Sequence, residues 1–103
     1  MKNITAQQLH ERMQLGEEVN LLDVREPNER TEFNIGGYHI PLGQVQTYML
    51  DDIEHLKDKE IVVYCRSGKR SQMAAMALEQ AGFTQVTNLS GGMLEWQEKI
   101  KQQ

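Results

Sequence analysis

The feature that most constrains the fold is a short apolar stretch that is followed by a glycine-containing turn and an amphipathic segment. Residues 61–64 (Ile-Val-Val-Tyr) are β-branched or aromatic, which favours a strand. A strand without a polar face suits the centre of a parallel sheet, where helices cover both faces. Residues 72–81 then place apolar side chains at helical spacing. A strand, a loop and a helix in this order are typical of α/β domains.

Strand-like and helix-like segments alternate along the rest of the chain. Further strands are predicted at residues 20–24 and 85–89, with a short extended piece at 38–42. Helices are predicted at residues 6–15, 27–32, 45–50, 51–56, 72–81 and 93–101. Because parallel strands are joined by right-handed helical crossovers, we expect a small three-layer α/β domain with a central parallel β-sheet flanked by helices.

The helical spacing also predicts which side chains are buried. Ser71 is expected to cap the helix at residues 72–81, and Gly82 to end it. The apolar face of this helix is predicted to consist of Met73, Ala74, Ala77, Leu78 and Ala81. In the last helix, Met93, Trp96 and Ile100 fall at helical spacing and are expected in the core, after a turn at Gly91 and Gly92.

Size and charge limit the classes of function. The 103 residues fit one domain, predicted to span residues 1–103. The net charge of −4 argues against nucleic acid or an anionic membrane as a partner, because both require a basic surface. No segment approaches the run of about 18 apolar residues that a membrane helix requires, and the N-terminus has no apolar signal-peptide core. A cytoplasmic location is therefore expected.

The chain contains a single cysteine, Cys65. This count excludes an intramolecular disulfide, Cys-x-x-Cys redox chemistry and a cysteine-rich zinc site. The three histidines, His10, His39 and His55, follow no metal-ligand spacing and are interpreted as surface or helix-lining residues. No metal or organic cofactor is predicted.

Cys65 directly follows the strongest strand, and ligands of open α/β sheets bind beyond the carboxyl ends of the strands. The short loop after it can turn backbone N–H groups inward as an anion-binding nest, with Gly68 supplying the conformational freedom. The positive end of the next helix is expected near Ser71. Three cations, Arg66, Lys69 and Arg70, also flank the loop. Together these features favour a thiolate, although a buried structural cysteine beside a solvated basic turn is the simpler alternative.

Four segments of the chain resemble, in order, the motifs of the rhodanese-like domain family. These are residues 21–27 (LLDVREP, with Glu29 following), 40–42 (IPL), 63–71 (VYCRSGKRS) and 89–96 (LSGGMLEW). Together they span residues 21–96. The chain departs from the family at residues 33–39 (FNIGGYH), where many members carry Gly-His-Ile before the IPL segment.

The resemblance implies a small α/β domain and a sulfurtransferase that forms a persulfide on its cysteine. Cys65 would be the nucleophile that takes sulfane sulfur from a small anionic donor such as thiosulfate and passes it to a thiol, to cyanide or to a protein acceptor. The residues implied to bind the donor are those of the loop: Arg66, Ser67, Gly68, Lys69, Arg70 and Ser71. Asp23 and Arg25 are interpreted as a structural ion pair, with a direct substrate contact of Arg25 as the alternative.

Two alternative functions belong to other classes. Phosphatases and arsenate reductases also place a thiolate in an anion-binding loop, but related phosphatases have five residues between the cysteine and the arginine. Here four residues separate Cys65 from Arg70, which favours sulfur chemistry. The second alternative is a non-catalytic or delivery-only binding module. Inactive members of the family typically lose the cysteine, which this chain retains.

Overall fold

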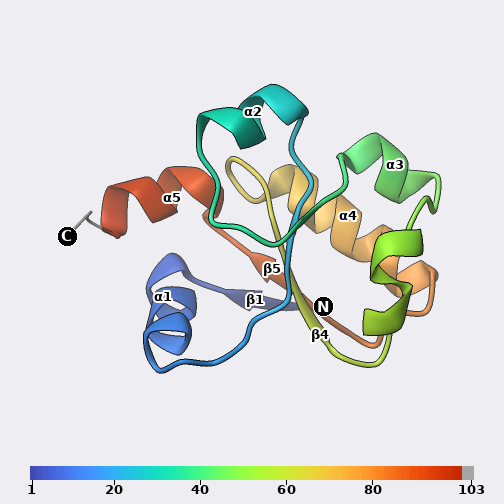
Figure 1. Cartoon of the computed structure of the whole chain (residues 1–103), viewed down its shortest axis with the longest axis horizontal. Helices are drawn as coiled ribbons and strands as arrows, with labels where there is room; N and C mark the ends of the chain where they lie inside the picture. Colours follow the sequence, from blue (N-terminus) through green and yellow to red (C-terminus); the bar gives the residue numbers. More distant parts are fainter. Residues whose placement is uncertain (101–103) are drawn as a thin grey trace.

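The computed structural model describes residues 1–100 and contains a five-stranded sheet in which every neighbouring pair is parallel. The strands are β1 (Lys2–Ile4), β2 (Leu21–Asp23), β3 (Tyr38–His39), β4 (Glu60–Tyr64) and β5 (Gln85–Leu89). Their order in the sheet is β1-β5-β4-β2-β3, so β4 lies at the centre (Figure 1). The predicted α/β fold with a central parallel sheet is confirmed.

Helices cover both faces of this sheet. They are α1 (Ala6–Gln14), α2 (Pro27–Glu32), α3 (Leu42–Gln46), the 3-10 helix η1 (Asp51–Leu56), α4 (Lys69–Gln80) and α5 (Gly92–Lys99). Side chains of α1 and α5 share one core cluster, whereas those of α3, η1 and α4 share the other. Among residues 1–100, no helix is long and apolar enough to cross a membrane.

The central strand β4 contributes to both clusters in alternation. Ile61 and Val63 pack with α4, while Val62 and Tyr64 pack with α1 and α5. All four side chains are fully buried. This alternation explains why the segment has no polar face, because successive residues of a strand point to opposite sides of the sheet.

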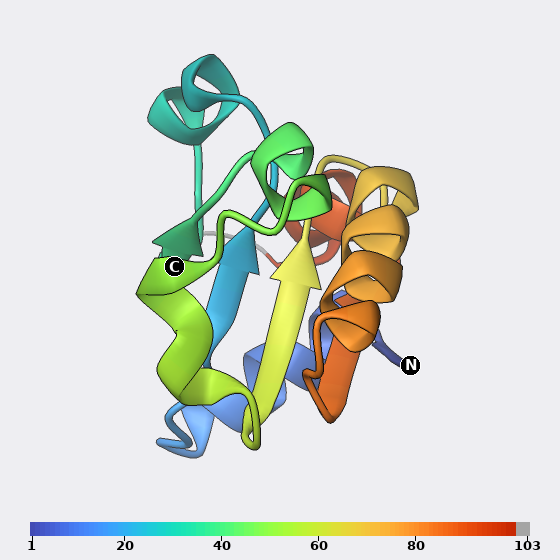
Figure 2. The same cartoon turned by 90° about the vertical axis from the view of Figure 1, so that its right-hand side faces the viewer.

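Helix α2 differs from the other helices in its position. It stands beyond the carboxyl ends of the strands, above the arrowheads in Figure 2, and none of its residues is buried. The helix is held by polar contacts instead of a core face. It therefore forms a wall at the end of the sheet where a ligand of an α/β domain binds.

The structure corrects the predicted start of α4. The N-cap is Gly68 and the helix begins at Lys69, so Ser71 lies inside the first turn and is not the cap. The reason is the left-handed conformation of Gly68, whose φ of 100° turns the chain directly into the helix. The Ser71 side chain is buried, and its hydroxyl bonds other side chains instead of the helix end.

The buried face of α4 also differs in part from the predicted one. Met73, which was predicted in the core, is 45% exposed, and Ala75 is buried in its place. The buried residues of α4 are Ser71, Ala74, Ala75, Ala77 and Leu78. Small alanines let the helix lie close to the sheet, whereas Met73 and Met76 point to solvent.

The other predicted elements differ from the structure mainly at their ends. Strand β1 was not predicted, because three residues at the edge of the sheet give no periodic signal. The helix expected at residues 45–50 is α3, which starts three residues earlier, and residues 51–56 form η1. Helix α5 ends at Lys99, and the last residue of the predicted helix, 101, lies outside the described residues.

A buried ion pair links the end of β2 to α2, as the sequence predicted. Arg25 donates from Nε and Nη2 to the two carboxylate oxygens of Asp23 at 2.9 and 2.8 Å, and both side chains are at most 5% exposed. Nη2 of Arg25 also donates to the carbonyl of Phe33 at 2.6 Å, just after α2. The guanidinium lies over the Tyr64 ring, 5.5 Å from its centroid. The pair therefore fixes where α2 stands.

Replacing Asp23 with alanine should lower the free energy of unfolding by about 3–5 kcal/mol, because it leaves the buried Arg25 charge without its partner. Urea unfolding of the two proteins measures this loss. The exposed pair between Glu54 and Lys57 is the control, since Glu54→Gln should cost less than about 1 kcal/mol. Equal losses for the two variants would contradict a structural role for the buried pair.

Candidate active site

Cys65 lies at the carboxyl end of β4, and its side chain is 1% exposed. The loop of residues 65–70 (the Cys65 loop) curls around the sulfur. Two donors reach Sγ: the backbone N–H of Gly68 at 3.1 Å and the hydroxyl of Ser71 at 3.4 Å. The predicted nucleophile therefore lies in a ring of hydrogen-bond donors, between a strand end and a helix start.

Gly68 is the residue that makes this curl possible. Its φ of 100° is a conformation that other L-residues rarely adopt, and a Cβ at this position would collide with the carbonyl oxygen of Ser90. The loop thus packs directly against the segment that follows β5. A side chain at position 68 would move the N–H that points at Sγ.

The start of α5 braces the Cys65 loop from its other side. The backbone N–H groups of Met93 and Leu94 donate to the carbonyls of Cys65 and Arg66, both at 2.9 Å. Gly92 permits this approach, because a Cβ there would collide with the same two carbonyls. The second glycine of the last motif, Gly92, is therefore part of the architecture of the site. Met93 and Trp96 are buried, as predicted.

A buried polar residue behind the loop, Asn88 of β5, was missed by the sequence analysis. Its Nδ2 donates to the carbonyl of Gly68 at 3.2 Å, and its Oδ1 lies 2.5 Å from Oγ of Ser71, whose single hydroxyl proton is shared between Asn88 and Sγ of Cys65. Asn88 thus holds the two residues that donate to the cysteine sulfur. The signal that could have drawn attention to it is a side-chain amide within a predicted strand, since a buried amide requires partners.

These contacts set the ionisation of Cys65. Burial is the largest single influence and opposes loss of the proton. Hydrogen bonds from the Ser71 hydroxyl and from the backbone N–H groups of Ser71, Gly68 and Ser67 act in the opposite direction and together outweigh it. The pKa of Cys65 is therefore lowered below the ordinary value of a thiol. This is the environment that a nucleophilic cysteine requires.

The three predicted cations of the loop have different surroundings. Arg66 and Lys69 are exposed, so their charges face solvent at the rim of the loop. Arg70 instead forms a two-pronged ion pair with Glu29 of α2, in which Nη1 and Nη2 donate to the two carboxylate oxygens at 2.8 Å each. This contact lowers the pKa of Glu29 to about 2. The charge of Arg70 is thus offset by a carboxylate to which the sequence analysis gave no role.

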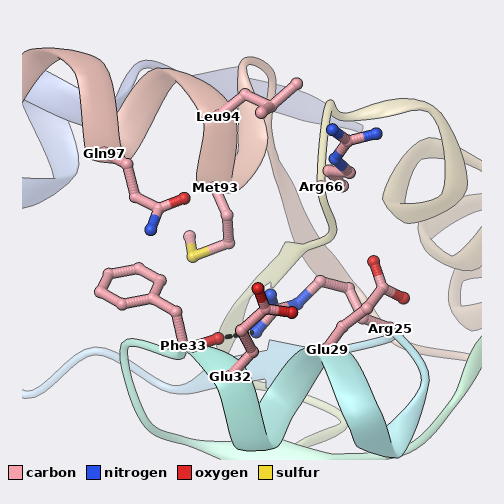
Figure 3. Close-up of a pocket in the computed structure, with 8 residues that line it drawn as sticks. All are labelled: Arg25, Glu29, Glu32, Phe33, Arg66, Met93, Leu94 and Gln97. Atoms are coloured by element: carbon pink, nitrogen blue, oxygen red, sulfur yellow. Dashed lines mark hydrogen bonds between the residues drawn. The ribbon is translucent and has the colours of Figure 1, made fainter.

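A pocket of about 440 Å³ lies beside the Cys65 loop, between α2 and α5 (Figure 3). Its walls are formed by Arg25, Glu29, Glu32, Phe33, Arg66, Met93, Leu94 and Gln97. Arg66 and the residues of α2 face one another across it (Figure 3). The guanidinium of Arg25 is part of the wall, but it is engaged with Asp23 and Phe33. The pocket therefore has charges of both signs and an apolar wall.

Residues 33–39, where the chain departs from the Gly-His-Ile motif, are held by hydrogen bonds from other parts of the chain. The Tyr64 hydroxyl donates to the carbonyl of Gly36 at 2.9 Å, and Arg30 donates to the carbonyl of Gly37 at 2.8 Å. His39 lies next to the carbonyl of Arg25, with 2.7 Å between Nε2 and the oxygen. These bonds join the segment to β4, to α2 and to the chain just after β2, and they keep it in place without the usual motif.

The three histidines contact different residues and do not form a cluster. His10 packs edge-on against Trp96, and His55 lies 3.2 Å from the Tyr38 hydroxyl. Within residues 1–100 there is no group of three or more side chains that could hold a metal ion.

The fold agrees with the comparisons with known proteins. The rhodanese-like domain profile matches residues 5–99, so the chain belongs to the rhodanese-like family. It is 39% identical to YtwF of Bacillus subtilis, with 98% of this chain and 95% of that protein covered. It is 35% identical to a sulfurtransferase of Allochromatium vinosum, with 93% and 88% covered. A rhodanese-like domain protein of Staphylococcus aureus shares the fold with a TM-score of 0.83 at 26% identity, over 97% and 95% of the two chains.

Some relatives are longer than this chain. It spans 65% of a matching Schizosaccharomyces pombe protein and 52% of another Bacillus subtilis protein, which are 39% and 37% identical over the matched parts. The domain therefore also occurs as one part of larger proteins.

Replacing Ser71 with alanine should raise the pKa of Cys65, because it removes the side-chain donor to Sγ while the thiol stays buried. The rate of alkylation by iodoacetamide as a function of pH measures this change, and at pH 7 the rate should fall several-fold. Ser67→Ala is the matched control, since Ser67 acts through its backbone N–H, which alanine retains. If the two variants had the same pH profile, the Ser71 hydroxyl would not stabilise the thiolate.

Proposed function

We propose that this protein is a sulfurtransferase that carries sulfane sulfur as a persulfide on Cys65. The observation that carries the proposal is the ring of donors around a buried sulfur with a lowered pKa. A thiolate in such a position is a nucleophile, and a persulfide formed on it is held by the same donors. The names of relatives such as the Allochromatium vinosum sulfurtransferase support this reading.

The first half-reaction forms one sulfur–sulfur bond and breaks another. The Cys65 thiolate attacks the outer sulfur of thiosulfate, and sulfite leaves with the electron pair of the cleaved bond. The enzyme then carries Cys65-S-S⁻. Backbone N–H groups from Arg66 to Ser71 stabilise the anionic outer sulfur, as a nest of amide groups does for other anions.

The second half-reaction regenerates the thiolate. A thiolate acceptor attacks the outer sulfur of the persulfide, and Cys65 leaves as a thiolate, so no oxidant or reductant is consumed. Cyanide can take the same sulfur in an assay and leaves as thiocyanate. The pocket beside the loop is larger than a small inorganic anion requires, and this supports an organic thiol or the side chain of a protein as an acceptor.

The cations of the loop act on the approach of the donor. Arg66 and Lys69, which are exposed, attract an anion to an otherwise acidic protein. Ser67 and Gly68 act through their backbone N–H groups, and Ser71 through its hydroxyl. Arg70 acts together with Glu29, because the two form one ion pair.

Incubation of the reduced protein with thiosulfate should add about 32 Da to its intact mass, the mass of one sulfur atom. Cyanide or dithiothreitol should reverse the gain, and Cys65→Ser should abolish it while the protein stays folded. Mass spectrometry together with circular dichroism provides both readouts. No mass gain in a folded protein with a titratable thiol would contradict the proposal and favour a binding module.

A further inference from the structure

The ion pair between Glu29 and Arg70 connects the wall helix α2 to the Cys65 loop. Two parallel N–H···O bonds of 2.8 Å join the groups, which is the strongest arrangement of an arginine and a carboxylate. The Arg70 side chain is 32% exposed and that of Glu29 is 22% exposed, so solvent screens the pair only in part. Both Nη atoms of Arg70 are therefore already bonded to Glu29 before a substrate binds.

Arg70 also lies within electrostatic reach of the reacting sulfur. Its pKa is raised mainly by Glu29 and, to a smaller extent, by the charge of the Cys65 thiolate. We expect a free guanidinium at this end of the Cys65 loop to attract the oxygens of an anionic donor. Glu29 covers the N–H groups that would do so and brings a negative charge to the same place.

From this contact we infer that Glu29 determines the charge selectivity of the Cys65 site: by holding Arg70, it disfavours dianionic sulfur donors such as thiosulfate and favours donors with at most one negative charge, such as organic persulfides and thiosulfonates. The inference rests on the sulfurtransferase proposal and adds a substrate class to it. Glu29 acts through Arg70, so it is a positioning residue and not a catalytic one.

The selectivity does not depend on the assay pH. Because the pKa of Glu29 lies near 2, its carboxylate is charged throughout the range in which the enzyme can be assayed. The Glu29 carboxylate weakens the binding of a dianion more than that of a monoanion, since the Coulomb energy is proportional to the charge of the sulfur donor. On a logarithmic scale, the effect of Glu29 on a dianion should be about twice its effect on a monoanion.

Glu29→Gln is the substitution that isolates the charge. Oε1 of Glu29 accepts from the backbone N–H of Glu26 at 3.0 Å at the start of α2, and glutamine can accept the same bond. The helix should therefore persist while the negative charge disappears. Glutamine keeps one acceptor oxygen for Nη1 of Arg70 but removes the acceptor of Nη2 and the negative charge. Nη2 and the uncompensated charge of Arg70 are then available to an anion.

Two donors that differ by one charge provide the test. Thiosulfate (2−) and methanethiosulfonate (1−) both transfer their outer sulfur to a thiolate, and they release sulfite and methanesulfinate respectively. In Glu29→Gln, the KM for thiosulfate should fall about tenfold and that for methanethiosulfonate about threefold, with kcat within about twofold of its original value. Equal changes for the two donors, or no fall in the KM for thiosulfate, would overturn the inference.

Glu32→Gln is the matched control. Glu32 belongs to the same helix and the same pocket wall, but it is not part of the ion pair. Glu32→Gln removes one negative charge as Glu29→Gln does, but it should change both KM values less than Glu29→Gln. In the double variant Glu29→Gln/Arg70→Ala, the KM for thiosulfate should return to about its original value, because a neutral pair of residues replaces a neutral ion pair. A low KM in the double variant, or an equal effect of Glu32→Gln, would show that the gain does not come from Arg70.

A second measurement does not require sulfur transfer. Sulfate (2−) and methanesulfonate (1−) are unreactive, and each should protect Cys65 from alkylation by iodoacetamide when it occupies the loop. In Glu29→Gln, the concentration of sulfate that gives half-protection should fall by more than that of methanesulfonate. If thiosulfate failed to load Cys65 but this difference held, the sulfurtransferase proposal would fail and the charge selectivity would stand. The absence of any difference would overturn the selectivity alone.

Discussion

The left-handed conformation of Gly68 is the constraint on which the site depends. It directs the N–H of this residue at Sγ of Cys65 and sends the chain into α4 at once. Glycine adopts this conformation without steric strain, because it has no Cβ atom. The carbonyl of Ser90 fills the space that a Cβ would need, so the loop and the segment after β5 fit each other only with glycine at this position.

The site is consequently part of the fold and not an addition to it. The carbonyls of Cys65 and Arg66 accept the first free N–H groups of α5, and Asn88 of the neighbouring strand holds both Gly68 and Ser71. Two elements from later in the sequence, β5 and α5, therefore help to determine the position of one sulfur atom. Rigid support of this kind preorganises the donors before a substrate arrives, which is how charge is stabilised efficiently in active sites.

The sequence predicted the parts of this structure that depend on local patterns. The apolar strand at residues 61–64, the parallel sheet, the buried Trp96 and the pair of Asp23 with Arg25 were correct. The start of α4 was wrong, because a buried serine in a first turn looks like an N-cap in the sequence. The contacts of Asn88 and the partner of Arg70 could not be predicted, since they join segments that only the folded chain brings together.

The pairing of Arg70 changes how the chemistry of the loop is understood. From the sequence, three cations could stabilise the thiolate, but the groups that lower the pKa of Cys65 most are hydrogen-bond donors without a net charge. Short-range donors in a buried loop are screened little by salt, whereas the exposed charges of Arg66 and Lys69 are screened strongly. Uncharged hydrogen-bond donors therefore hold the Cys65 sulfur, whereas the charges of Arg66 and Lys69 face solvent and that of Arg70 is offset by Glu29.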